Sequence, residues 1–132
     1  MNKSIVVCIV VVLFSFTLQA RAGSYPFRVS LDGKDAVLRS ANDVFAVIDN
    51  PVSADAVIVA DAEDDTIFIN IFASNERGEV ASDTMPAVIL YRPDTTVRLD
   101  NTMDGSRLEP GYYLMNVVAP SKGTSRVVFR IE

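Results

Sequence analysis

Short apolar runs separated by turn-forming residues follow one another along most of the chain. In the first run, 25–31, apolar and polar side chains alternate, and Asp32-Gly33 closes it as a turn. Runs of the same kind follow at 36–39, 44–48, 56–60, 66–73, 87–91, 95–99, 112–119 and 126–131. No segment holds a helical period over three turns. The pattern therefore predicts an all-β fold of about seven to nine short strands.

The spacing of the turns indicates how these strands are arranged. Asn50-Pro51, Asp104-Gly105 and Lys122-Gly123 are among the pairs that interrupt the runs. Turns that recur about every ten residues are typical of a β-sandwich or a small barrel. No internal repeat or linker divides residues 23–132, which we expect to form a single domain.

Residues 1–22 have the composition of a secretory signal peptide. Lys3 supplies a short positive start, and the run from Ile5 to Leu18 is almost entirely apolar. Ala20-Arg21-Ala22 then offers the small residues of a cleavage site before Gly23. An uncleaved anchor is the alternative, but the 14-residue run is shorter than the roughly 20 residues that cross a bilayer. We expect an exported protein, periplasmic or extracellular, with no membrane contact after cleavage.

The six residues from Leu108 to Tyr113, LEPGYY, combine a Pro-Gly corner with a tyrosine that starts a strand. They resemble the tyrosine corner of immunoglobulin-like and fibronectin type III-like domains, although the spacing is one residue shorter than in many of the latter. The resemblance implies a Greek-key, immunoglobulin-like β-sandwich in which the Tyr113 hydroxyl bonds the backbone upstream of the corner. Met115 stands where antibody-type domains carry their second core cysteine, so we expect no disulfide of that kind.

Two runs are apolar on both faces, which a sandwich strand with one buried face does not require. In 66–73 the three isoleucines occupy one face and two phenylalanines the other. In 112–119, if Tyr113 faces the core, the alternate residues face outward, and most of these are apolar too. In 126–131 the same period leaves Val128 outside, between two arginines. The candidate binding residues on this second face are Phe68, Phe72, Tyr112, Leu114 and Val118.

The apolar second face must be covered, and two alternatives could cover it. The first is a loop or edge segment of the chain itself, and the second is a protein partner or another copy of the chain. In the usual Greek-key order the strands at 66–73 and 112–119 are near neighbours, which would join their outer side chains into one patch.

The residue types exclude most catalytic chemistry. The chain has no histidine, and its only cysteine, Cys8, lies in the predicted signal peptide. Ser-His-Asp and Cys-His catalysis and conventional zinc sites are thereby excluded. Lys34 and Lys122, the lysines beyond the signal peptide, each adjoin a turn glycine, unlike a buried lysine base. We expect no enzyme, no catalytic residue and no cofactor.

The charge of the chain indicates which partners to expect. Cleavage would remove Lys3 and Arg21, leaving 10 of the 12 basic and all 17 acidic residues, a net charge of −7. Such a surface repels nucleic acid. The acidic clusters at 61–65 and 100–104 could supply oxygen ligands to calcium, but neither follows the EF-hand alternation. We therefore expect solvated loop charge there and no metal site.

These features favour a non-catalytic, exported protein-interaction module of the assembly-factor, periplasmic-chaperone or inhibitor type. It would act through the apolar second face or a free edge strand. One alternative is a glycan-binding accessory domain, with Tyr91 and Tyr112 as stacking surfaces and calcium in an acidic loop; the lack of tryptophan counts against it. A second alternative is a fibre or pilus-type subunit that polymerises by strand addition.

Overall fold

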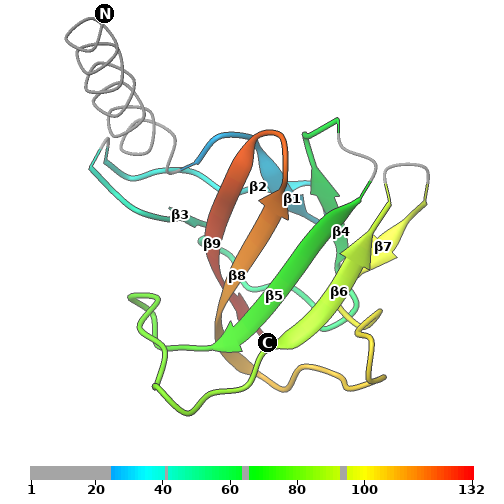
Figure 1. The fold of residues 1–132 in the computed structure, drawn as a ribbon. Helices are drawn as coiled ribbons and strands as arrows, with labels where there is room; N and C mark the ends of the chain where they lie inside the picture. The colour runs from blue at the N-terminus through cyan, green and yellow to red at the C-terminus, as the bar shows by residue number, and fades with distance from the viewer. Residues whose placement is uncertain (1–24, 41, 64–65, 93–94) are drawn as a thin grey trace, which may run out of the picture.

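The computed structural model describes residues 25–40, 42–63, 66–92 and 95–132 (Figure 1). The predicted signal peptide, 1–22, and its cleavage point before Gly23 lie outside these residues. The described residues form no helix, and so none that is long and apolar enough to cross a membrane. The prediction of an all-β fold is confirmed.

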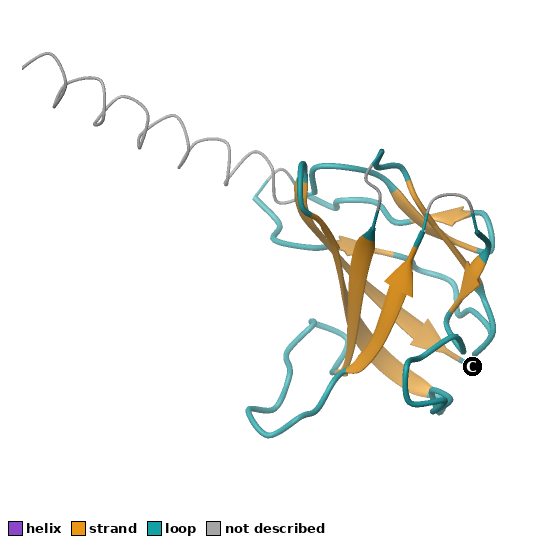
Figure 2. Ribbon diagram, turned by 45° about the vertical axis from the view of Figure 1, so that its right-hand side comes forward, coloured by secondary structure: helices purple, strands orange, loops and turns teal. Residues whose placement is uncertain are grey.

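Within the described residues, nine strands form two sheets. The strands are β1 (Val29–Leu31), β2 (Lys34–Asp35), β3 (Ala46–Val47), β4 (Val57–Ala60), β5 (Ile67–Ala73), β6 (Ala87–Tyr91), β7 (Val97–Arg98), β8 (Gly111–Ala119) and β9 (Gly123–Ile131). One sheet has the order β2-β1-β4-β7 and the other the order β3-β9-β8-β5-β6. Neighbouring strands are antiparallel except β3 and β9, which run parallel. The two sheets lie in two layers, an arrangement compatible with a β-sandwich (Figure 2).

The chain turns sharply after β1, and this turn displaces one predicted strand. Asp32 and Gly33 have φ angles of 51° and 77°, the positive values that a two-residue type I′ hairpin turn requires. Because β2 begins directly after them, the strand predicted at 36–39 is wrong in its position. Within that range, Val37 forms an isolated bridge with Val47.

The residues between the two sheets form a core that alternates along each long strand. On β5, Ile67, Ile69 and Ile71 are at most 1% exposed, as the period of two predicts. Each buried isoleucine stabilises the fold by roughly 1.5–3 kcal/mol. Since Cys8 is the only cysteine, no disulfide within the chain can assist. The apolar core therefore supplies most of the stability.

Two polar side chains hold the segment that precedes β1. The Tyr25 hydroxyl accepts the Val29 N–H at 2.7 Å and donates to the Ala36 carbonyl at 3.2 Å. The Ser125 hydroxyl, fully buried on β9, donates to the Phe27 carbonyl at 2.8 Å and accepts the Phe27 N–H at 3.3 Å. Side chains thus satisfy backbone groups that a neighbouring strand would otherwise bond. The run predicted at 25–31 is accordingly a strand only over 29–31.

The expected tyrosine corner is present at the start of β8. The Tyr113 hydroxyl donates to the Glu109 carbonyl at 2.6 Å, and its ring stacks on Phe129 with centroids 5.7 Å apart. Gly111 takes a φ of 146°, which favours glycine, and Leu108 packs against the core beside it. Burial raises the pKa of the Tyr113 hydroxyl above its ordinary value. Tyr113 therefore has a structural role in this corner.

Tyr113→Phe should lower the free energy of unfolding by about 1–2 kcal/mol, because it removes one largely buried hydrogen bond while keeping the ring. Denaturant titration of the two proteins measures the difference. Tyr112→Phe is the matched control, since the Tyr112 hydroxyl makes no hydrogen bond to a described residue, and it should change stability by less than about 0.5 kcal/mol. Equal effects of the two changes would contradict the structural role of the corner.

Candidate functional site

The outward side chains of the five-stranded sheet form rows that cross neighbouring strands. The first, which we name the open row, consists of Leu90 on β6, Phe68 on β5 and Val118 on β8, each directly opposite the next. A middle row contains Val88, Asn70 and Asn116, and a far row contains Phe72, Leu114 and Val128. Directly opposite side chains in antiparallel strands interact. The prediction that the two apolar strands are neighbours is confirmed.

The open row is the part of this face that remains accessible. Phe68 is 44% exposed and Leu90 is 42% exposed, while Val118 is half-buried. Of the predicted binding residues, Phe68 is thus the most accessible. Leu90 was missed by the sequence analysis, although its place one position from Ile89, a core residue, puts it on the outer face by the period of two.

The open row ends at the free edge of the sheet. β6 is the last strand of the five, as Figure 1 shows. The Val88 carbonyl accepts the Met103 N–H at 2.8 Å from the side away from β5. Because backbone groups alternate in direction along a strand, the N–H and C=O of Leu90 also point away from β5. Over the described residues, the Met103 bond is the one backbone hydrogen bond along this edge.

The far row is closed at one end by the chain itself. Val128 lies on the outer face, as predicted, but it is only 1% exposed. Gly78, in the loop between β5 and β6, approaches so closely that an added Cβ would lie 3.0 Å from Val128 Cγ2 and 3.2 Å from Phe45 Cε1. This loop extends away from the ends of β5 and β6 in Figure 2. At Val128 the chain itself therefore covers the outer face.

Asn75 shapes the turn that brings Gly78 to Val128. Its Oδ1 accepts the N–H groups of Arg77 and Glu79 at 2.9 and 3.0 Å, and its Nδ2 donates to Glu79 Oε1 at 2.8 Å. This last bond, and the nearby Arg77 guanidinium, lower the pKa of the Glu79 carboxyl. Gly78 takes a φ of 74°, a conformation that side chains rarely adopt. The contact that covers Val128 thus depends on the conformation of this turn.

Asn116 lies at the centre of the face with an unsatisfied acceptor. Its Oδ1 is buried and has no hydrogen-bond partner among the described residues. Asn70 and Arg126 are its cross-strand neighbours. A buried acceptor without a partner costs about 1–3 kcal/mol.

The two tyrosines considered for sugar stacking are both unsuited to an open platform. Tyr91 is buried at 8% exposure, on the core side of β6 with Ile89, so its predicted role as a stacking surface is wrong. Tyr112 is half-buried, and the Arg130 guanidinium lies 5.9 Å from the centroid of its ring. Its ring therefore already holds a cation.

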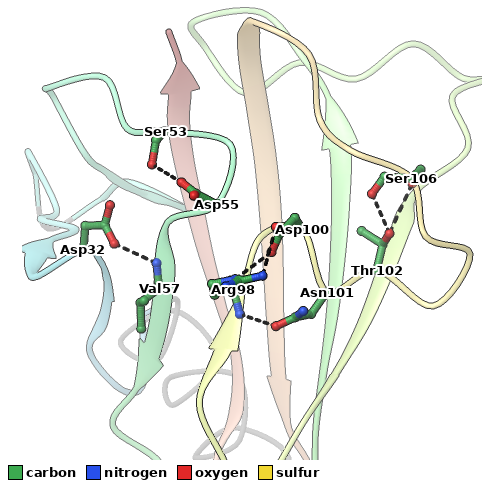
Figure 3. Close-up of polar contacts among 9 residues, drawn as sticks. All are labelled: Asp32, Ser53, Asp55, Val57, Arg98, Asp100, Asn101, Thr102 and Ser106. Atoms are coloured by element: carbon green, nitrogen blue, oxygen red, sulfur yellow. Dashed lines mark hydrogen bonds and ion pairs between the residues drawn. The ribbon is translucent and has the colours of Figure 1, made fainter.

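Three of the four described acidic residues in the two predicted clusters have a partner within the protein. In the later cluster, Arg98 binds Asp100 through two nitrogens at 2.9 and 3.2 Å (Figure 3). Asp104 accepts the Ser106 N–H at 3.0 Å, and its bonding to Ser106 lowers its pKa. In the earlier cluster, Asp61 faces Arg28 at 3.9 Å, while residues 64–65 lie outside the described part. Among the described residues, no three acidic groups are placed to hold a metal ion.

Two further carboxylates nearby also bond to groups of the protein itself. Asp32 Oδ1 accepts the Val57 N–H at 2.8 Å, and Ser53 donates to Asp55 at 2.7 Å, which lowers the pKa of Asp55 (Figure 3). Each carboxylate thus has a donor within the protein. These contacts stabilise turns of the four-stranded sheet.

Millimolar calcium or a chelator should leave the melting temperature nearly unchanged, because Asp100 and Asp104 already have protein partners. Calorimetry in both conditions tests this. A ligand present at 100 times its dissociation constant would add about 2.7 kcal/mol, which corresponds to a shift of several degrees in a domain of this size. A calcium-dependent rise of that order would contradict the prediction and direct attention to residues 61–65.

Gly78→Ala should lower the free energy of unfolding by about 2–3 kcal/mol. The change adds positive-φ strain of roughly 1–2 kcal/mol and forces a Cβ against Val128. Gly105→Ala is the matched control, because Gly105 has a similar φ of 77° with nothing within 4 Å of the added Cβ. Denaturant titration should show a smaller loss for the control, and equal losses would contradict the contact between the loop and Val128.

The function of the chain is inferred from this geometry. No protein-family model, curated protein or solved structure matches the chain.

Proposed function

We propose that this chain is an exported, non-catalytic immunoglobulin-like module that binds another protein through the open row and the adjoining edge of β6. The observation that carries the proposal is the accessible pair Phe68 and Leu90, 44% and 42% exposed, beside backbone groups that point out of the sheet. Export rests on the composition of residues 1–22.

The order of the strands supports the immunoglobulin-like assignment. In such domains the F and G strands form a hairpin next to strand C, and variable-type domains add C′ beyond it. The order β9-β8-β5-β6 corresponds to G-F-C-C′, and β1-β4-β7 corresponds to A-B-E. The tyrosine corner at Tyr113 starts the strand that corresponds to F, where these domains carry it.

The chemistry of the edge favours an extended peptide segment as the partner. A strand added to a sheet edge gains main-chain hydrogen bonds, and apolar side chains beside the edge supply contact area. β6 has the sequence AVILY, without the lysine, proline or bulge that commonly protects an edge. The row itself carries no charge, so an apolar segment suits it despite the acidic balance of the chain.

A sugar-binding role has less support, because Tyr91 is buried and the Tyr112 ring lies under Arg130. A fibre subunit would use the same edge with another copy of the chain as the partner.

Phe68→Ser should reduce partner capture by about tenfold or more while changing the melting temperature little, since aromatic residues carry much of the binding energy at interfaces. Val59→Ser is the matched control, because Val59 is 50% exposed on the outer side of β4, in the other sheet. The immobilised protein is incubated with extract of the export compartment, and the captured proteins are quantified by mass spectrometry. Equal capture by both variants would contradict the proposal.

A second substitution tests the edge itself. Leu90→Pro removes an N–H that points away from β5, so the ladder to β5 is kept and a partner strand is blocked. Ile89→Pro is its control, because it removes an N–H that faces β5 and should unfold the sheet. Sedimentation equilibrium distinguishes the fibre alternative from binding of another protein. A fibre subunit would self-associate when unmodified, and its folded Leu90→Pro variant would not. Unchanged capture by that variant would exclude strand addition.

A further inference from the structure

A cavity of about 330 Å³ lies on the same outer face, beyond Val128 and away from the open row. Three parts of the chain form it: the turn after β5, the segments that flank β3, and the paired ends of β8 and β9. These parts bring together Glu76, Arg77, Arg39, Asp49, Tyr112 and Arg130. The volume falls in the range of small-ligand sites, roughly 300–1,000 Å³.

Of the three arginines that line the cavity, two already have carboxylate partners. Arg39 binds Asp49, and Arg77 binds Glu79 at 2.9 Å. For Arg130, by contrast, no carboxylate of the described residues lies within ion-pair distance. Its guanidinium lies over the Tyr112 ring instead, 5.9 Å from the centroid. Arg130 thus lines the cavity without an ion-pair partner among the described residues.

The remaining walls determine which anion would fit. Val47, Ile48 and Val128 form the apolar part of the lining, and of these the half-buried Val47 is the one that a short carbon chain can contact. Asp49 and Glu76 also line the cavity, and Asp49 is already paired with Arg39. A doubly charged phosphate would be repelled by these carboxylates more strongly than a singly charged group, so a single negative charge suits Arg130 better.

We propose that this cavity binds a carboxylate carried on a short apolar chain, with Arg130 as the anchor. The planar guanidinium binds a carboxylate through two parallel hydrogen bonds. Tyr112 holds the guanidinium in place before the ligand arrives, which lowers the entropic cost of binding. The carboxylate belongs to a free small acid or to the C-terminus of a peptide, two sources with the same chemistry. The inference does not rest on the open row.

The test is titration of isotope-labelled protein, purified after export from cells that express the full chain, with amide shifts followed by NMR. The probes are hexanoate, hexanol, inorganic phosphate, and the tripeptide Ala-Leu-Val with a free or amidated C-terminus. Hexanoate or the free-acid peptide should give saturable shifts at Tyr112, Val128 and Arg130, and the tighter of the two identifies the source. Hexanol, the amidated peptide and phosphate should bind at least about tenfold more weakly.

Arg130→Gln should weaken carboxylate binding by about tenfold or more, and Arg130→Lys, which keeps the charge without the planar fork, should weaken it less. Arg126→Gln is the matched control, because Arg126 is an exposed arginine on the same face of β9 and does not line the cavity. If neither carboxylate probe binds, or if hexanol binds as well as hexanoate, the proposal is wrong. An equal loss in Arg126→Gln and Arg130→Gln would also overturn it, since it would show attraction to overall charge only.

Discussion

The register of β8 between β5 and β9 is the constraint on which the rest of the structure depends. β8 pairs with both neighbours, over six positions with β5 and nine with β9, so a slip of one residue would exchange its core and outer side chains. The Tyr113 hydroxyl bond to Glu109 fixes the point at which the strand starts. Because Tyr113 also stacks on Phe129, the corner and the register are held by the same side chain.

The register also decides which outer side chains meet, but it does not decide which are covered. Phe68 and Val128 lie on the same face, yet one is 44% exposed and the other 1%. At Val128 the turn with Gly78 and the neighbouring strand β3 both lie close, and the turn reaches this end of the face. Single exposed apolar residues are normal on protein surfaces. The open row has functional interest because Leu90 lies on, and Phe68 lies beside, the edge strand β6, along which Met103 makes the one backbone hydrogen bond among the described residues.

The sequence predicted what depends on local periodicity and little that depends on contacts between distant residues. The strand rhythm, the isoleucine face of β5 and the corner at Tyr113 all follow from positions within a few residues of one another. The Ser125 bonds to Phe27 and the contact of Gly78 with Val128 join residues far apart in the chain, so no local pattern reports them. The burial of Tyr91, by contrast, could have been predicted locally. The period of two places Tyr91 on the same side of its strand as the core residue Ile89.

The turn that contains Asn75 and Gly78 connects the two ends of the outer face. It covers Val128 through Gly78, and it contributes Glu76 and Arg77 to the walls of the cavity. A displacement of this turn would expose Val128 and open the cavity at the same time, because one short segment makes both contacts. Three hydrogen bonds of the Asn75 side chain, all to Arg77 and Glu79, fix the shape of this turn. The shape of the cavity and the exposure of the far row are therefore set by one local structure, whereas the open row, at the other end of the sheet, is set by the register of β5 with β6 and β8.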